Sequence, residues 1–372
     1  MRKHYLDNLR WVTVLLVLVY HVVFFFNNKG VFGGVGGFSP NSNDQPQDVL
    51  MYVLYPWFML LLFLVAGIST RYAIHKPHFF RSRTRKLLVP ATIGLFVFQW
   101  MVGYFNALSA IDAIPPMIRY VVFAFSGIGP LWFVQDLWLF TLFIFLISKI
   151  DRDRLYSFLG KFFSSSRLLP TILLILFGFV LLWAGAQVVI THPNPQSLDG
   201  LFNLYRPVTY FVIFLMGYYV FSLDEVQRRV TQIWLPTTLI AIVLGIVLTL
   251  TTWGQNMTDP IYLTNWLTNL YAWFAILAML GCFAKWCDRT GPFATYMTRS
   301  SYGIYIVHYL VVVSVGYMLK VRTSLPPVAI YLILLTAVLL LSPVLYELLH
   351  RIPFIRWCVF GEKKNNKSNN EK

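Results

Sequence analysis

Three ionisable residues stand well inside long apolar stretches of the sequence, namely His21, Asp136 and His308, while Arg10 and Glu347 stand near the ends of such stretches. Ionisable groups in this setting are energetically costly, usually face the interior of a helix bundle, and often have a function. A neutral imidazole there can accept a proton from a hydroxyl group, so His21 is a candidate general base. The alternative for His21 is a structural role, in which the ring only hydrogen-bonds a neighbouring helix.

Helical periodicity places Arg10 and His21 on the same face of one helix. Eleven residues at 100° each return to within about 20° of the starting direction after three turns. Asp7, Val14 and Val17 share this face. At a rise of about 1.5 Å per residue, His21 lies roughly 15 Å beyond the start of the apolar stretch. This depth is close to the middle of a bilayer.

His308 shares a helix face with two further polar residues. Ser301, Tyr305 and His308 follow one another at the spacing i, i+4 and i+7, which aligns their side chains along one side of a helix. The arrangement fits either a catalytic group or a hydrogen bond between helices.

Two carboxylates are further candidates, and Glu347 is the weaker of them. Asp136 follows Trp132 by four residues inside an apolar stretch, so we expect it to be paired, protonated or in contact with water. Structural pairing and catalysis are equally compatible with its position. Glu347 lies one helical turn before Arg351, and an ordinary salt bridge would explain both residues.

The composition identifies the class of protein that must hold these residues. Of 372 residues, 58% are hydrophobic and only 12% are charged, about half the roughly 25% of soluble proteins. Such a composition excludes soluble domains and a disordered chain. The apolar runs are continuous rather than alternating, which excludes a membrane β-barrel. We therefore expect an all-α polytopic membrane protein.

The apolar runs define the expected membrane spans, since a helix needs about 20 mostly apolar residues to cross a bilayer. We expect about ten transmembrane helices, at residues 11–28, 49–70, 87–106, 131–148, 168–190, 207–223, 233–253, 265–285, 300–319 and 327–348. The apolar segment 117–126 is short, and we interpret it as interfacial or re-entrant. Residues 1–350 then form one transmembrane domain, followed by a basic tail, 351–372, whose end is expected to be disordered.

The distribution of Lys and Arg orients these spans. With the N-terminus in the cytoplasm, 25 of the 30 basic residues fall in cytoplasmic segments, as the positive-inside rule requires. Both termini are then cytoplasmic. The net charge of +15 fits contact with anionic membrane lipid, and no module typical of nucleic-acid binding is present.

A cluster of basic residues between the second and third expected spans could bind phosphate. The loop 71–86 contains Arg83, Arg85 and Lys86 among six basic residues. Arginine forms bidentate pairs with phosphate, so this loop could hold a phosphorylated cytoplasmic ligand. Positive-inside bias alone would also produce such a cluster. We expect no metal site, because the three cysteines and the other candidate ligands lack the spacing of metal ligands.

The motifs resemble those of integral-membrane acyltransferase family 3. Residues 5–10 read Tyr-Leu-Asp-Asn-Leu-Arg, and ten residues separate Arg10 from His21, similar to the basic residue, ten-residue interval and histidine of that family's first helix. Further segments resemble family elements in the same order: Phe58–Gly67, Arg83–Pro90, Leu131–Val134, Ser301–His308 and Tyr346–Pro353. The pattern most resembles the branch that contains the glucan biosynthesis protein C.

The resemblance implies a membrane O-acyltransferase in the bacterial cytoplasmic membrane. It would move an acetyl or succinyl group from cytoplasmic acyl-CoA to a hydroxyl of a cell-envelope glycan or glucan, without a permanently bound cofactor. The implied catalytic residues are His21, Asp136 and His308, and the implied donor-binding residues are Arg10, Arg83, Arg85 and Lys86. Supporting positions are Asp7, Trp132, Ser301, Tyr305 and Glu347.

Two positions depart from the family pattern. Lys86 stands in place of the second arginine of an Arg-x-x-Arg motif, unless Arg81 or Arg85 takes that role. Pro130 stands where this branch often has histidine.

The sequence alone is also compatible with functions other than acyl transfer. Histidine and aspartate within a membrane are equally expected in a proton-coupled transporter or in a flippase for an envelope sugar or lipid-linked intermediate. A non-catalytic partner of an envelope-polymer synthase is a third possibility. For an acyltransferase, His21 could act as a general base or form a transient acyl-histidine.

Overall fold

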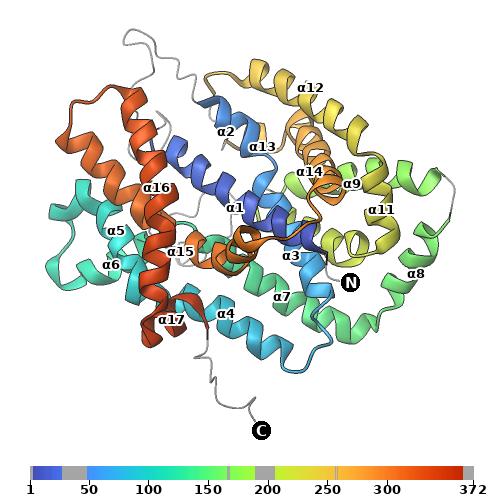
Figure 1. Ribbon diagram of the computed structural model, residues 1–372, viewed down its shortest axis with the longest axis horizontal. Helices are drawn as coiled ribbons and strands as arrows, with labels where there is room; N and C mark the ends of the chain where they lie inside the picture. The colour runs from blue at the N-terminus through green and yellow to red at the C-terminus, as the bar shows by residue number, and fades with distance from the viewer. Residues whose placement is uncertain are drawn as a thin grey trace.

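The computed structural model describes residues 3–26, 48–165, 168–188, 206–255, 257 and 259–362. All regular elements among these residues are helices. In Figure 1, the long helix α15 (Pro292–Arg322) lies at the centre of the bundle, between α1 (His4–Phe25), α16 (Pro327–His350) and α7 (Leu131–Asp151).

The other membrane-length segments surround this centre. They are α2 with α3 (Val49–Leu54 and Phe58–Arg71), α4 with η2 and α5 (Phe79–Gly94, Leu95–Gln99 and Trp100–Ala107), α9 (Leu169–Ala186), α10 with η6 (Pro207–Met216 and Gly217–Phe221), α12 (Trp234–Thr252) and α14 (Trp266–Trp286). The shorter helices are η3 (Leu108–Ala113), η4 (Pro116–Ile118), α6 (Arg119–Ser126), α8 (Arg154–Phe163), α11 (Asp224–Gln232), α13 (Pro260–Leu263) and α17 (Pro353–Phe360).

The expected fold class is confirmed. Among the described residues, nine helices are long and apolar enough to cross a membrane, and ten if the bent pair formed by residues 207–221 and 224–232 counts as one span. The two halves of this pair meet at 100°. A membrane-spanning helix satisfies all its backbone hydrogen bonds internally, which is why such a composition folds into helices.

Several expected boundaries were wrong, because polar residues extend the helices beyond the apolar runs. The first helix begins at His4 rather than at residue 11, and its largely buried N-terminal turn has partners in the connection after α14. The Tyr5 amide donates to Asp288 Oδ1 at 2.9 Å. The Asn8 side chain donates to the carbonyl oxygens of Cys287 and Arg289, both at 2.7 Å.

The basic segment 71–86 is also largely helical rather than a loop. Only residues 72–78 form the connection, and α4 begins at Phe79. Arg83, Arg85 and Lys86 therefore lie on the first turns of a helix, where their spacing decides which way each side chain points.

The apolar segment 117–126 lies within a short helix, Pro116–Ser126, which is below membrane-spanning length. This helix packs closely on the preceding one: a Cβ atom built on Gly103 of α5 would lie 1.7 Å from the Phe123 carbonyl oxygen. Whether the segment is interfacial or re-entrant stays a prediction.

A close crossing of α3 and the α10–η6 segment depends on two glycines. A Cβ atom on Gly67 would lie 2.1 Å from the Phe214 carbonyl oxygen, and one on Gly217 would lie 2.1 Å from the Leu64 carbonyl oxygen. Small residues allow helix backbones to approach each other in membranes. This crossing holds α3, whose opposite side faces the candidate site, in place.

The beginning of the C-terminal tail is ordered and packs against α4. Cys358 of α17 is fully buried, and its carbonyl oxygen would lie 2.9 Å from a Cβ on Gly94. Gly361 follows α17 with φ +65° next to the Arg85 backbone. The expected disorder concerns residues 363–372, which lie outside the described residues.

Candidate active site

His21 and His308 form a pair in the interior of the bundle. The His308 Nε2 atom lies 3.1 Å from the His21 Nδ1 atom, and the ring centroids are 5.0 Å apart. The two residues come from α1 and α15, which pack side by side in the centre of the molecule (Figure 1). His308 is fully buried, whereas His21 is partly exposed.

The hydrogen bonds of the pair define the tautomers of the neutral rings. His308 Nδ1 lies 2.5 Å from the Tyr305 carbonyl oxygen, and His21 Nδ1 lies 2.9 Å from the Val17 carbonyl oxygen. A carbonyl oxygen only accepts hydrogen bonds, so each Nδ1 carries the hydrogen. The Nδ1–H of His21 is then shared between Val17 and the lone pair on His308 Nε2. This leaves a lone pair on His21 Nε2, the atom that a general base requires.

Aromatic rings enclose the histidine pair. The Tyr309 ring meets the His21 ring edge-on, with centroids 5.1 Å apart. Tyr305 lies 5.6 Å from His308, centroid to centroid, and its hydroxyl donates to the Pro130 carbonyl oxygen at 2.6 Å. The Pro130 position thus contributes a backbone acceptor to the neighbourhood of the pair, and Tyr305 joins α15 to the start of α7.

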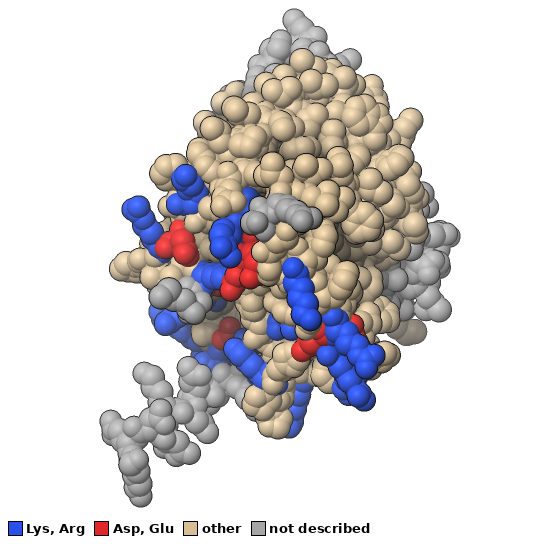
Figure 2. Space-filling view, turned by 90° about the vertical axis from the view of Figure 1, so that its right-hand side faces the viewer, with Lys and Arg blue, Asp and Glu red and all other residues tan. Residues whose placement is uncertain are grey.

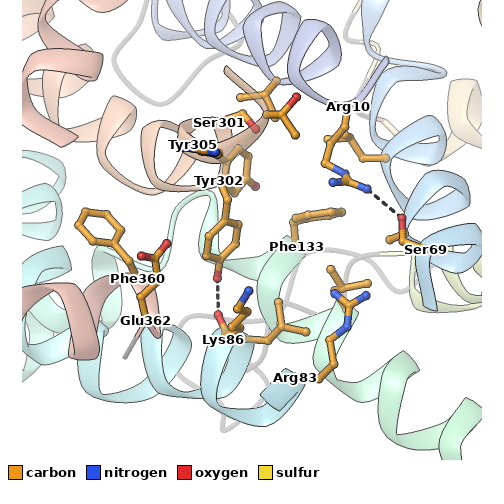
Figure 3. A pocket seen from close by; sticks show the side chains of 17 residues that line it. Arg10, Ser69, Arg83, Lys86, Phe133, Ser301, Tyr302, Tyr305, Phe360 and Glu362 are labelled. Atoms are coloured by element: carbon orange, nitrogen blue, oxygen red, sulfur yellow. Dashed lines mark hydrogen bonds between the residues drawn. The ribbon is translucent and has the colours of Figure 1, made fainter. Parts of the chain in front are cut away.

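A cavity of about 320 Å³ opens below this pair. Its mouth carries four cationic side chains, those of Arg10, Arg83, Lys86 and Arg299, and one carboxylate, that of Glu362. Figure 3 shows Arg10 extending from one side, and Arg83 and Lys86 from the other, toward a common space next to Phe133. The rest of the lining is mostly apolar and includes the polar side chains of Ser69, Thr298, Ser301, Tyr302 and Tyr305. Such a rim is suited to a polyanion.

Helical periodicity explains which residues of α4 line the cavity. Arg83, Lys86 and Leu87 follow one another at i, i+3 and i+4 and all line the cavity, as residues on one helix face do. Arg85 lies on another face, and its Nε donates to the Gly361 carbonyl oxygen at 3.2 Å. Lys86 therefore shares the cavity with Arg83, while Arg85 contacts the C-terminal segment.

Arg10 connects the cavity to the helix that carries His21. Its Nη2 donates to Ser69 Oγ at 2.8 Å, and its Nη1 lies 3.6 Å from Asp7 Oδ1. Of the residues expected on one face of α1, Arg10 and Val14 line the cavity, whereas Asp7, Val17 and His21 do not. Asp7 holds the guanidinium from one side, in agreement with an orienting role.

The cavity ends about one helical turn short of the histidine pair. Ser301 and Tyr305 line it, and His308 follows Tyr305 by three residues on the same helix. This distance corresponds to roughly 4.5 Å of helix rise. Neither His21 nor His308 lines the cavity itself.

Three further predicted site residues do not line the cavity. Asp136 is fully buried, and among the described residues neither of its carboxylate oxygens has a hydrogen-bond partner. Trp132 packs against Tyr210, with ring centroids 5.2 Å apart. Glu347 lies beside the Tyr296 hydroxyl and, within the described part of the chain, forms no ion pair with Arg351. The catalytic assignment of Asp136 stays a prediction that the geometry does not connect to the pair.

Sequence reasoning missed Arg299, Tyr302 and Glu362 as cavity residues. Arg299 was assigned to a connecting loop, whereas α15 begins at Pro292. The available signal was its spacing from Tyr302. Residues three apart lie on one helix face, so Arg299 continues the face that carries Tyr302. The Tyr302 hydroxyl donates to the Lys86 carbonyl oxygen at 2.7 Å and joins α15 to α4. Glu362 gave no sequence signal.

The family model of an acyltransferase domain matches residues 3–347. The chain belongs to this family of acyltransferases. Comparisons with curated proteins and with solved structures found no match. The matched range includes α1, α4 and α15, and so it contains the histidine pair and the four cations of the cavity mouth.

The protein is therefore a multi-pass membrane acyltransferase. The family match favours this class over the transporter, the flippase and the non-catalytic partner. Within the described residues of the acyltransferase, no group of three His, Cys, Asp or Glu side chains is arranged to hold a metal ion.

Proposed function

We propose that this acyltransferase moves an acetyl or succinyl group from cytoplasmic acyl-CoA to a hydroxyl group of a cell-envelope glycan. The observation that carries the proposal is the alignment of a basic cavity with a histidine pair on the same two helices. Arg10 and His21 lie on α1, and Arg299 and His308 lie on α15. The family match supports acyl transfer, and the cation-rich mouth supports a donor with several phosphates.

The cations of the mouth are the proposed phosphate ligands. Arg83 and Lys86 face Arg10 across the cavity (Figure 3). Arginine binds phosphate through two parallel hydrogen bonds, and lysine acts as a mobile point charge. The one carboxylate of the mouth, Glu362, lies 2.8 Å from His350 Nε2. The mouth is therefore strongly positive.

The length of the donor matches the depth of the histidine pair. His21 follows Arg10 by eleven residues on a continuous helix, which corresponds to about 16 Å. An extended acyl–pantetheine arm is about as long. With phosphates at the mouth, the thioester reaches the region of Tyr305 and His21. For this, the side chains that fill the last helical turn between the cavity and the pair must move aside.

The proposed chemistry uses the lone pair on His21 Nε2. The acceptor hydroxyl gives its proton to this nitrogen as its oxygen attacks the thioester carbon. The resulting tetrahedral intermediate loses the thiolate when the carbon–sulfur bond breaks. The imidazolium returns its proton to the departing sulfur, so the products are an ester and free CoA. His308 Nε2 and the Val17 carbonyl oxygen hold the Nδ1–H of His21 throughout.

The acceptor is proposed to enter from the side opposite the basic mouth. The basic segments at the starts of α1, α4 and α15 and at the ends of α7 and α14 support a cytoplasmic mouth, since the positive-inside rule puts such segments in the cytoplasm. Figure 2 views the face on which α8 lies, where Lys and Arg gather over the lower part and the upper part carries none. With cytoplasmic termini, the acceptor is an envelope glycan, and the motif pattern favours a periplasmic glucan.

Acyl transfer by the purified protein tests the proposal. The protein, reconstituted in lipid nanodiscs, is incubated with acetyl-CoA or succinyl-CoA and with periplasmic glucan, and both free thiol and acylated glucan are measured. We expect both products with wild-type protein, and formation of both slowed by about 10²–10⁴ in His21→Ala. Equal product formation by His21→Ala, or no turnover of either donor, would contradict the proposal.

A further inference from the structure

A second hollow adjoins the basic cavity. It has a volume of about 680 Å³ and shares Arg10 and Ser69 with the first cavity. Its other walls come from the start of α1, from the connection 72–78 and from the start of α11. The two hollows therefore adjoin at Arg10 and Ser69.

The lining of this second hollow combines an aromatic ring with lysines. Tyr72 is 46% exposed. Lys3 Nζ lies 5.8 Å from the centre of the Tyr72 ring, and the exposed Lys76 lines the same space. An exposed aromatic face stacks on nucleobases with little preference among them, and lysine attracts phosphate. The lining therefore suits a phosphorylated nucleoside.

Among the charged side chains of the second hollow, Lys76 is available to bind an anionic ligand. Asp7 pairs with Arg10, and the Asp224 carboxylate pairs with Lys3, which also donates to Gln227 at 2.5 Å. The Lys76 side chain forms no ion pair or hydrogen bond with any described residue. Three cations and two carboxylates line the hollow, so it carries net positive charge at Lys76.

The volume of the first cavity indicates that it cannot hold a whole CoA thioester. Sites for ordinary small ligands measure about 300–1,000 Å³. The first cavity, at about 320 Å³, lies at the lower end of this range, and a CoA thioester combines a nucleotide, a diphosphate and a long arm. The first cavity is also lined by apolar side chains, among them Leu62, Phe133 and Leu137, which fits the arm better than the nucleotide.

We propose that the second hollow is the nucleoside subsite of the donor. The 3′-phosphoadenosine part of CoA lies there, with its base on Tyr72 and its 3′-phosphate at Lys76. The diphosphate lies at Arg10, which belongs to both hollows, and the pantetheine arm continues through the first cavity. This inference rests on the proposed acyl-CoA donor and adds the recognition of the 3′-phosphate.

Binding of CoA and of 3′-dephospho-CoA distinguishes this arrangement from general attraction by a basic surface. Both affinities are measured by calorimetry on the full-length protein in nanodiscs. For Lys76→Ala we expect about a fivefold loss of affinity for CoA, the effect of one exposed charge pair, and unchanged affinity for 3′-dephospho-CoA. Arg81→Ala is the matched control, because Arg81 is an exposed α4 cation outside both hollows, and neither affinity should change.

The aromatic contact has its own pair of variants. Tyr72→Leu should weaken both ligands to the same degree, whereas Tyr72→Phe keeps the ring and should bind both normally. Thermal unfolding confirms that each variant is folded. Equal losses for both ligands in Lys76→Ala, or no loss in that variant, would overturn the assignment. If wild-type protein binds neither ligand, the proposed acyl-CoA donor itself is wrong, which separates the failure of the two proposals.

Discussion

The His308 Nε2 atom lies 3.1 Å from the His21 Nδ1 atom, although 287 residues separate the two in the sequence. This contact, together with the carbonyl oxygens of Val17 and Tyr305, gives each ring one defined tautomer and leaves His21 Nε2 as a proton acceptor. The two rings thus have different roles: His21 is the candidate base, and His308 is the residue that positions it.

Replacement of His21 should remove most of the activity. Acyl transfer by His21→Ala should fall by a factor of about 10²–10⁴, the usual contribution of a general base. Rates are measured as release of free CoA in the presence of the acceptor. Because His21 is partly exposed, we expect the melting temperature to stay close to that of wild type. A rate within threefold of wild type in a folded variant would rule out a catalytic imidazole at this position.

Replacement of His308 should lower turnover without weakening donor binding. In His308→Leu the His21 Nδ1–H loses one of its two acceptors, and we expect kcat to fall about ten- to a hundredfold, corresponding to roughly 1.4–2.8 kcal/mol. The KM for acyl-CoA should stay unchanged. His308→Gln can present its amide oxygen near the position of Nε2 and should recover part of kcat. Equal loss in both variants, or a rise in KM alone, would argue against a positioning role.

The two cations of the α4 face should bind the donor jointly. We expect the double variant Arg83→Ala with Lys86→Ala to lose at least about tenfold in affinity for CoA at low salt, because two charge-assisted contacts are removed. Its salt dependence should also be weaker than that of wild type. The comparison is Arg85→Ala, because Arg85 contacts the Gly361 carbonyl oxygen outside the cavity. Unchanged binding in the double variant would place the donor elsewhere.

The crossing of α3 and η6 should not tolerate a methyl group. In Gly217→Ala the new Cβ would meet the Leu64 backbone at 2.1 Å, so the helices must separate at a cost of about 1–3 kcal/mol. We expect a lower melting temperature in detergent. Gly291→Ala is the matched control, since a Cβ there meets nothing within 4 Å. Equal melting temperatures of the two variants would show that the crossing is loose.

Much of the fold was determined by local properties of the chain. The length of each apolar run predicts a membrane span. Ten spans were expected, and the described part of the chain has nine, or ten with the bent pair. The common face of Arg10, Val14 and His21 follows from helical periodicity alone. Both inferences concern residues within one helix, whose geometry is the same in any surroundings. Boundaries were less accurate, because the polar ends of α1, α4 and α15 have partners outside their own helix.

The site itself was decided by tertiary structure, because its parts lie on different helices. Periodicity shows which residues share a helix face, but only the packing of helices shows which faces meet. Packing places His308 next to His21, and it places Arg85 against Gly361, away from Arg83. The same holds for Arg299 and for the hollow beside Arg10, which depend on where three or more helices end. Asp136 shows the converse: its burial in an apolar helix was evident from the sequence, while its separation from the cavity was not.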